Sequence, residues 1–329
     1  MSIFHTGVNP FKRTKVVPIF FAINNNYAPY AAVAMHALTR YLDPTRYYRV
    51  IILHDGLSWA NRVKLRALVT KNCAIQFKQI SSSIYLKTLI KYCDSKRKGA
   101  VDFFSSAVYY YRFFIPRLFP MYNKCVYIDS DVILRDDIGE LFDTALDDNV
   151  AAAVPELVMS TIPEFTVYCD EAIRVPHREY VNTGVMVLDL KKMRKMHYLS
   201  KMIDMIGKYD ADLLAPDQDY FNVILRGKIK LLDRCWNTGP QEDITGQTKL
   251  LHYYLFKKPW HYDDVPHQDL FWDAAKGTGY YGELQRQLAA FTPAERRKDE
   301  DKIASYIKKA AKLTKAAKAA GAPILKNPE

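Results

Sequence analysis

Short apolar runs alternate with segments of helical period through most of this chain of 329 residues, and this alternation limits the folds open to it. Strands buried on both faces are continuous apolar runs, whereas amphipathic helices repeat apolar residues three and four apart. We predict strands at 16–22, 50–53, 74–80, 125–128, 150–154, 183–188 and 249–252, and helices at 30–41, 58–68 with Ser58 as N-cap, 106–115 ending at Pro116, 190–206 and 217–225. Such alternation predicts an α/β protein with a mostly parallel sheet.

Two aspartates follow the strand at 125–128. Asp129 and Asp131 lie two residues apart around Ser130, so both carboxylates point to one side at the carboxyl edge of the sheet, where open α/β sheets bind ligands. Two carboxylates there can hold a divalent cation that bridges a diphosphate. The alternative is a turn in which the aspartates bond their own backbone. Apolar residues on both sides of the triplet favour the metal site, because buried carboxylates need compensation.

A histidine and a lysine follow the last predicted strand. His252 ends the run at 249–252, and Lys258 precedes Pro259. A histidine at such a position is either a core residue or a ligand. One imidazole nitrogen with two carboxylates suits Mn²⁺ better than Mg²⁺, and the lysine could neutralise a phosphate.

Two further motifs contain polar residues at the ends of predicted elements. Asp217 in Asp217-Gln218-Asp219 can cap a helix, which explains the aspartate and leaves Gln218 without a structural task. In Asn182-Thr183-Gly184-Val185 a glycine begins a strand, which permits a close approach to the backbone.

Taken in order, these segments resemble glycosyltransferase family 8 over about residues 16–275. The motifs that carry the resemblance are Phe21-Ala22 with Asn26-Tyr27, Tyr111-Arg112, Tyr127-Ile128-Asp129-Ser130-Asp131, Asn182-Thr183-Gly184-Val185 with Asp189 and Arg194, Asp217-Gln218-Asp219, and His252 with Lys258-Pro259-Trp260. The resemblance implies a GT-A nucleotide-sugar-binding fold, a UDP-sugar donor, Mn²⁺ (or Mg²⁺), and retention of anomeric configuration. It also implies transfer of glucose or galactose to a glycan, glycolipid or glycoprotein, as in the synthesis of lipopolysaccharide or other surface glycans.

The same resemblance implies roles for single residues. The metal ligands would be Asp129, Asp131 and His252; donor and nucleotide binding would involve Ala22, Asn24, Asn26, Tyr27, Ser130, Asn182, Leu255 and Lys258; and Arg112, Asp217 and Gln218 would act at the reacting sugar. Two positions depart from the family. Many members have aspartate, which accepts from the uracil imide N–H, in place of Asn24, whose carbonyl oxygen can also accept. Many have glycine in place of Leu255, so the backbone contact with phosphate stays open there. Because Gln218 is a poor nucleophile, we expect same-face attack, with a departing phosphate oxygen helping to deprotonate the acceptor.

The C-terminal tail differs from the rest of the chain. Its residues Ile303, Tyr306, Ile307, Ala310, Leu313 and Ala317 share one face of a helix whose other face is rich in lysine. Residues 302–320 then either lie on an anionic membrane surface or pack this stripe on the domain. We predict a GT-A domain at 1–275 and a helical extension at 276–329.

Charge and cysteine content bound the remaining alternatives. The net charge of +11 suits an anionic ligand, nucleic acid or a membrane surface. No nucleic-acid-binding motif and no basic stripe outside the tail are present, so we expect no nucleic-acid partner. The five cysteines are scattered and form no CxxC pair, and residues 1–14 lack the apolar core of a signal peptide. These features predict a cytoplasmic protein, which could also bind the inner face of the cell membrane peripherally. The rival functions are a nucleotidyltransferase, a nucleic-acid-binding protein and a donor-binding protein without catalysis. The aromatic segment 260–272 either contacts the acceptor or packs the extension onto the domain.

Overall fold

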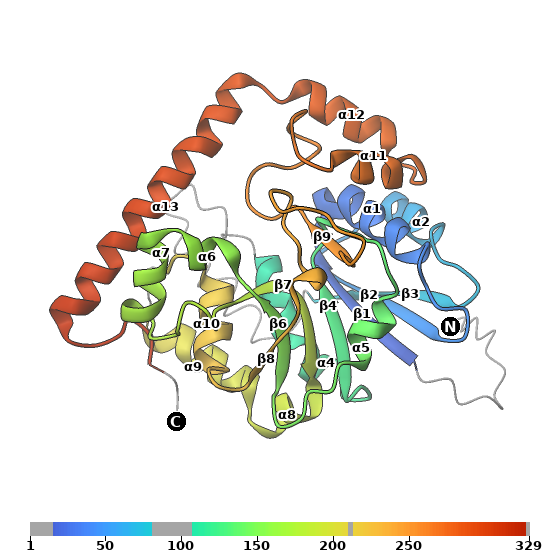
Figure 1. Ribbon diagram of the computed structural model, residues 1–329. Coiled ribbons are helices and arrows are strands. Elements are labelled where there is room, and N and C mark those ends of the chain that lie inside the picture. Colours follow the sequence, from blue (N-terminus) through green and yellow to red (C-terminus); the bar gives the residue numbers. More distant parts are fainter. Residues whose placement is uncertain (1–15, 81–106, 210–212, 327–329) are drawn as a thin grey trace.

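Most of the predicted strands lie in one sheet (Figure 1). The computed structural model describes residues 16–80, 107–209 and 213–326. Within these residues the main sheet has seven strands in the order β3-β2-β1-β4-β7-β6-β8, with β4 at its centre. Its strands are β1 Val16–Ile23, β2 Tyr47–His54, β3 Cys73–Gln79, β4 Lys124–Ile128, β6 Ala151–Pro155, β7 Val181–Asp189 and β8 Ile229–Leu231. A second, two-stranded sheet pairs β5 Val132–Leu134 with β9 Leu250–His252.

Helices cover both faces of the main sheet (Figure 1). They are α1 Ala28–Thr39, α2 Trp59–Arg66, α4 Ile115–Leu118, α5 Ile138–Asp143, α6 Leu157–Thr161, α7 Pro163–Val167, α8 Leu190–Lys195, α9 Tyr198–Tyr209, α10 Pro216–Ile224, α11 Gln268–Lys276, α12 Tyr281–Ala290 and α13 Pro293–Ala320. The 3₁₀ helices are η1 Asn25–Tyr27, η2 Ala107–Phe114 and η4 Arg234–Trp236, and η3 Tyr168–Ala172 is a π-helix. Ser58 caps α2 as predicted, because its Oγ accepts from the N–H of Asn61 at 3.2 Å.

The sheet is mixed but mostly parallel. β1 runs parallel to β2 and β4, β2 to β3, and β6 to β8, whereas β7 runs antiparallel to both β4 and β6. Alternate residues of β1 enter different cores: Phe20 packs with the cluster under α8–α10, and Phe21 with the cluster under α1 and α11. This layered arrangement confirms the predicted α/β fold.

The direction of β7 determines which residues lie together at the carboxyl edge of the sheet. Because β7 is antiparallel to β4, its first residues lie beside the last residues of β4, and Val185 pairs with Ile128. β6 is antiparallel to β7 in turn, so β6 also ends at this edge. Residues that follow β1, β4 and β6 therefore meet residues that begin β7.

Two predicted helices differ from the structure. The single helix at 190–206 was wrong: α8 and α9 are separate, and between them His197 adopts a left-handed φ of 56°. Ser106, the predicted start of an earlier helix, lies outside the described residues. The predicted stop at Pro116 was also wrong, because this proline occupies the first turn of α4, where a missing N–H costs nothing.

The apolar stripe of the tail packs on the domain. α13 runs along one edge of the molecule from α12 to α7 (Figure 1), and Ala310, Leu313 and Ala317 are buried in the same cluster as α9 and α10. This is the packing alternative, and it leaves Lys308, Lys312 and Lys315 exposed. The predicted boundary between residues 275 and 276 falls in the last turn of α11, and the division there stays a prediction.

Two observations concern membrane-spanning helices and cysteines, the features on which the predicted compartment depends. Among the described residues, no helix combines the length and apolar character needed to cross a membrane. Cys73, Cys125, Cys169 and Cys235 are free thiols, and Cys93 lies outside the described residues.

Candidate active site

One cavity opens at the carboxyl edge of the sheet, with a volume of about 370 Å³. Of the sequence-predicted site residues, those on its wall are Ala22, Asn24, Tyr27, Arg112, Asp129, Ser130, Asp131, Asn182, Asp217, Gln218, His252, Leu255 and Lys258. Asn26 is not on the wall: it is exposed in η1, and its backbone N–H donates to Asn24 instead. The structure thus brings together residues that lie more than 200 positions apart in the chain.

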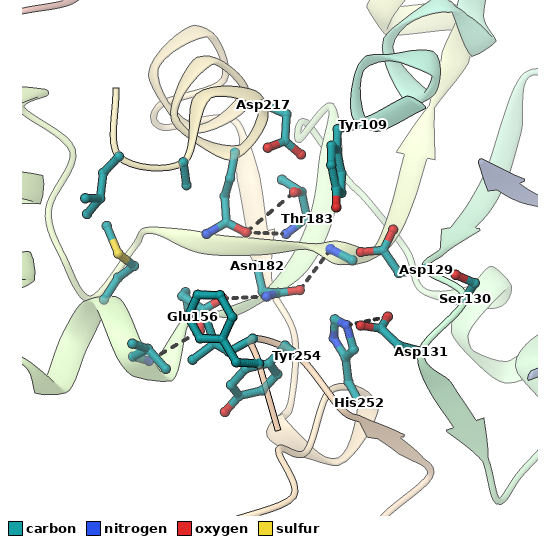
Figure 2. A pocket seen from close by; sticks show the side chains of 18 of the residues that line it. Tyr109, Asp129, Ser130, Asp131, Glu156, Asn182, Thr183, Asp217, His252 and Tyr254 are labelled. Atoms are coloured by element: carbon teal, nitrogen blue, oxygen red, sulfur yellow. Dashed lines mark hydrogen bonds and ion pairs between the residues drawn. The ribbon is translucent and has the colours of Figure 1, made fainter. Parts of the chain in front are cut away.

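Asp129 and Asp131 lie between β4 and β5. The backbone N–H of Asp129 donates to the carbonyl oxygen of Gly184 at 2.7 Å, which ties the triplet to β7. Val132 then pairs with His252 across the small sheet, so β9 delivers the imidazole to the two aspartates. One ligand atom from each of Asp129, Asp131 and His252 lies within 4.8 Å of the others. Figure 2 shows these three side chains around a common space.

The chemistry of this group fits a divalent cation. Two carboxylate oxygens and one imidazole nitrogen form a donor set that suits Mn²⁺. The Nδ1 of His252 lies 2.9 Å from Asn237 Oδ1, which leaves Nε2 on the side of the carboxylates. Close spacing, convergent orientation and a second hydrogen bond to the imidazole are the usual features of a metal site.

Positive charge already surrounds Asp131. Lys258 Nζ lies 2.5 Å from Asp131 Oδ2, and His252 Nε2 lies 3.1 Å from Asp131 Oδ1. Burial acts to raise the pKa of the Asp131 carboxyl, but Lys258 and His252 outweigh it and hold that pKa well below its usual range. Lys258 also donates to the carbonyl oxygen of Tyr253. This carboxylate therefore stays ionised, as a metal ligand must.

Another group of wall residues is arranged around Arg112. Its Nη1 donates to the carbonyl oxygen of Thr183 at 2.6 Å, and its Nη2 donates to Asp129 Oδ1 at 3.2 Å and lies 3.7 Å from Asp217 Oδ2. Burial raises the pKa of the Asp217 carboxyl to about 6, although Arg112 opposes this. Gln218 Oε1 accepts from the N–H of Thr183 at 3.0 Å. The first residues of α10 thus bind the beginning of β7.

In the region predicted to bind uridine, the side chain of Asn24 caps the 3₁₀ helix η1, which we did not predict. Asn24 Oδ1 accepts from the backbone N–H groups of Asn26 and Tyr27 at 3.0 and 3.1 Å and so begins η1. This is the oxygen that we expected to accept from a uracil imide, and both of its lone-pair directions are already used. The Nδ2 group of Asn24 is therefore the part of this side chain that could form a hydrogen bond with a base, as a donor.

Leu255 is a second departure with a structural consequence. It lies on the cavity wall directly after Tyr254 and adopts a left-handed φ of 61°. This conformation favours glycine, because a Cβ crowds the following carbonyl. The loop therefore keeps the backbone shape of a glycine while it carries a leucine side chain.

Gly184 needs to be glycine for a different reason. A Cβ at this position would lie 2.4 Å from His252 Cε1 and 2.7 Å from Asp129 Oδ2. The close approach that the glycine was predicted to allow is thus an approach of β7 to the candidate metal ligands Asp129 and His252.

Several wall residues were not predicted. The polar ones are Tyr109, Glu156, Thr183 and Tyr254, and the apolar ones are Val108, Val158, Met159, Ile162, Phe165, Leu214, Ala215, Phe256, Ile303 and Tyr306. Glu156 could have been found, because it follows a predicted strand at the same edge as Asp129. Most of the apolar residues come from α6, α7 and the link between them and from α13, and the others from η2, the segment before α10 and the loop after β9. No local pattern marks them as one surface.

The aromatic segment 260–272 packs inside the molecule. Trp260 stacks on Tyr30 with ring centroids 3.9 Å apart, and Tyr262 and Phe271 are buried beside it. None of these rings is on the cavity wall. Tyr262 packs against Phe291 and donates to Asp299, so the packing of the extension onto the domain holds for Tyr262, whereas Trp260 and Phe271 pack within residues 1–275.

Comparisons with known proteins identify the family. The model of Glycosyl transferase family 8 matches residues 18–264. The chain is 30% identical over 171 residues to a lipopolysaccharide 1,2-glucosyltransferase of Escherichia coli, a match that covers 48% of this chain and 50% of that protein. It is 23% identical over 259 residues to a putative glycosyltransferase of Haemophilus influenzae, covering 75% and 74%. It is 32% identical over 164 residues to the probable galacturonosyltransferase-like 2 of Arabidopsis thaliana, covering 42% and 47%. The chain thus spans about half the length of the first and third of these relatives.

Solved structures share the fold. The bifunctional glycosyltransferase WbbM superposes with a TM-score of 0.68 at 22% identity, over 86% of this chain and 53% of that one. The galactosyltransferase LgtC, in complex with donor and acceptor sugar analogues, superposes with a TM-score of 0.66 at 23% identity, over 81% of this chain and 100% of that one. These likenesses confirm the predicted GT-A fold.

Proposed function

This chain belongs to glycosyl transferase family 8, and on that premise we propose that it transfers a hexose from a UDP-sugar to a hydroxyl of a glycan or glycoconjugate, with retention and with Mn²⁺. The observation that carries the proposal is the arrangement of one cavity. Asp129, Asp131 and His252 converge on one part of its wall, and Asp217 and Gln218 lie on another. Such an arrangement suits a diphosphate and its sugar held at the same time.

We assign the metal to Asp129, Asp131 and His252, with Mg²⁺ as a poorer substitute for Mn²⁺. When bound, the cation would neutralise charge on the diphosphate and so assist the departure of UDP. Lys258 supports this assignment, because an ammonium group 2.5 Å from Asp131 can also reach a phosphate at the same place.

We assign the uridine to the part of the cavity that Ala22, Asn24 and Tyr27 line, with the Tyr27 ring against the base. The Nδ2 of Asn24, which makes no hydrogen bond to the residues that the structure describes, would donate to a uracil carbonyl, since the oxygen of Asn24 caps η1. This replaces the imide contact that we expected from the sequence.

For the chemical step we propose same-face attack by the acceptor hydroxyl. Gln218 has its oxygen bonded to the N–H of Thr183, and Asp217 lies 3.7 Å from Arg112 in a buried ion pair. The Gln218 amide is a poor nucleophile, and Arg112 reduces the negative charge of Asp217, so we propose no double displacement through either residue. Trapping of a glycosyl-enzyme adduct, detected by mass spectrometry, would contradict this step.

We assign the acceptor substrate to the part of the cavity whose wall is mostly apolar, which we call its apolar end. Val158, Met159, Phe165 and Tyr306 form much of this wall, next to the region of the donor sugar. Apolar and aromatic walls bind the C–H faces of sugars and the hydrophobic groups attached to them. The relatives named for glucosyl and galactosyl transfer support a hexose donor and a surface glycan such as lipopolysaccharide as acceptor.

We also propose that the tail contacts an anionic membrane from the cytoplasmic side through charge alone. Lys308, Lys312 and Lys315 are exposed on α13, whereas Ala310, Leu313 and Ala317 of its apolar stripe are buried. Electrostatic binding of this kind should disappear at high ionic strength. Sedimentation with anionic vesicles at low and high salt measures it.

A screen of UDP-sugars for UDP release tests the central proposal, because donor hydrolysis needs no acceptor. We expect release with UDP-glucose or UDP-galactose in Mn²⁺ and none in excess EDTA. Release of pyrophosphate from UTP and a sugar phosphate would indicate a nucleotidyltransferase instead. No release with any UDP-sugar would contradict the proposed donor class.

A further inference from the structure

A buried row of polar side chains leads away from the candidate metal ligands. His252 Nδ1 lies 2.9 Å from Asn237 Oδ1, and Asn237 Nδ2 donates to Asn182 Oδ1 at 3.0 Å. Asn182 Nδ2 donates in turn to Glu156. His252 is 2% exposed and Asn237 1%, and the other two are also buried. Figure 2 shows Glu156, Asn182 and His252 along this row.

The direction of these hydrogen bonds follows from the groups that touch the row. The backbone N–H of Gly184 can only donate, and it lies 2.8 Å from the Asn182 atom that must therefore be the oxygen. Asn182 then presents Nδ2 to Glu156, whose carboxylate accepts. Asn237 must present Nδ2 to the oxygen of Asn182, so its own oxygen faces His252. An oxygen at this place requires a proton on Nδ1 of the imidazole.

The geometry points to Asn237 as a positioning residue for the metal ligand His252. By accepting from Nδ1–H, Asn237 holds the ring with Nε2 toward Asp129 and Asp131, where Nε2 would give its lone pair to a bound cation in place of the hydrogen bond that it makes to Asp131 Oδ1 at 3.1 Å. Asn182 and Glu156 hold Asn237 in this orientation from behind. Metal affinity then depends on a side chain that does not touch the metal. The inference rests on the proposed function in one respect, that the site of His252 binds a metal.

The cavity wall does not include Asn237, so its effect can reach the site only through its neighbours. Partners that orient a histidine ligand typically contribute about 10–100-fold to metal affinity. An alternative view is that Asn237 only fills space and satisfies hydrogen bonds in the core. The two views predict different Mn²⁺ affinities for a variant that keeps an oxygen to accept from His252 Nδ1–H but loses the Nδ2 group that donates to Asn182.

The test measures the dissociation constant for Mn²⁺ in the full chain without donor, from the electron paramagnetic resonance signal of free Mn²⁺. Asn237→Leu has a similar volume but cannot accept from Nδ1–H, and we expect Mn²⁺ to bind at least about 10-fold more weakly. Asn237→Asp keeps an acceptor for Nδ1–H but opposes the oxygen of Asn182. It should lose stability while its Mn²⁺ affinity stays within about threefold of wild type. Equal losses of affinity in both variants, or none in Asn237→Leu, would overturn the inference.

A double-mutant cycle asks whether Asn237 acts through His252. In a His252→Ala background, Asn237→Leu should change the dissociation constant for Mn²⁺ by less than about twofold. A further loss as large as in the wild-type background would show another route and refute the positioning role. Asn72→Leu is the matched control, since Asn72 Nδ2 also makes two hydrogen bonds, to Asp43 and Arg46, far from the cavity. Circular dichroism confirms that each variant is folded.

The outcome separates this inference from the proposed function. If the wild-type chain does not bind Mn²⁺, the metal assignment fails. If the wild type and Asn237→Leu bind Mn²⁺ equally well, the metal assignment stands and only the role of Asn237 is refuted.

Discussion

The two ends of the cavity are held together by opposite kinds of interaction. At one end Asp131 is fixed by Lys258 and His252, and charges and hydrogen bonds set every position. At the other end Met159 and Phe165 belong to the buried hydrophobic cluster that also includes part of α13. A buried charge pair contributes little net stability because its desolvation is costly, although removal of one partner leaves the other charge unpaired. Buried apolar side chains contribute much stability. Substitutions at the polar end should therefore affect activity most, whereas substitutions at the apolar end should affect stability most.

The largest effect is expected at the polar end, from Asp131→Ala. This change removes a ligand from the candidate metal site and the partner of Lys258. We expect Mn²⁺-dependent UDP release to fall by about 10³-fold, the upper range for losing one group that stabilises a developing charge. The fold should persist, as measured by circular dichroism and thermal unfolding.

Asp148→Ala provides the control for Asp131→Ala. Asp148 is exposed and lies outside the cavity wall, and its substitution makes the same change in net charge. It should release UDP at the wild-type rate. If Asp131→Ala turned over normally in excess EDTA, the metal assignment would be wrong.

A smaller loss is expected when the ligands are displaced but kept. Gly184→Ala places a methyl group 2.4 Å from His252 Cε1 and 2.7 Å from Asp129 Oδ2, so one or both ligands must move. A displacement of about 1 Å in such a site can reduce the rate about 10²-fold. Gly207→Ala in α9 is the matched control, because open space surrounds its Cβ and alanine favours a helix. Equal UDP release by the two variants would show that β7 does not constrain the ligands.

The polar end was largely predictable from the sequence, and the reason is geometric. Asp129 follows a strand whose apolar run is evident, and parallel strands deliver such residues to one edge. The pairing of β5 with β9 was not predictable, because two strands of three residues carry no period. Asn237 was missed for a similar reason: it follows the short helix η4, and only the folded chain places it behind His252.

The apolar end was not predictable. α6 and α7 have five residues each, which is too short for a helical period to be recognised. The stripe on α13 was visible in the sequence, but two partners could cover it, and tertiary packing decides between them. Local patterns thus predicted the residues that follow long strands, and they failed where short elements from distant parts of the chain form one surface.

The apolar end can be tested with Met159→Ala. Met159 is buried in the cluster and also reaches the cavity wall. Its truncation should lower the free energy of unfolding by about 3 kcal/mol, measured by urea titration. UDP release per folded molecule in saturating donor should change by less than about threefold, since no donor contact is lost. A loss of activity as large as that of Gly184→Ala, without a loss of stability, would break the contrast between the two ends.

An effect on stability no larger than that of Met159→Ala is expected at Asp219, a buried carboxylate of α10. It accepts from Tyr180 at 2.6 Å, from Tyr168 at 2.8 Å and from the N–H of Ala215 at 3.0 Å, and Lys309 is the cation that acts on it. Burial nevertheless raises its pKa to about 6 from 3.8. Because the folded pKa is raised, the stability that protonated Asp219 contributes is complete below pH 4 and is lost as the pH rises through 6.

Asp219→Asn removes this titration while it keeps the shape of the side chain. Other carboxyls also titrate between pH 4 and 7, so the informative quantity is the difference in unfolding free energy between variant and wild type. We expect this difference to shift in favour of the variant by at most about 3 kcal/mol between pH 4 and 7, since one pKa unit corresponds to about 1.4 kcal/mol. The amide of the variant accepts hydrogen bonds from Tyr168 and Tyr180 less well than the carboxylate does. This lowers the stability of the variant by a similar amount at every pH, so it does not change how the difference varies with pH. A difference that does not vary with pH would mean that Asp219 is as readily ionised in the folded chain as in the unfolded one, and that its three donors stabilise the carboxylate enough to cancel the cost of burial.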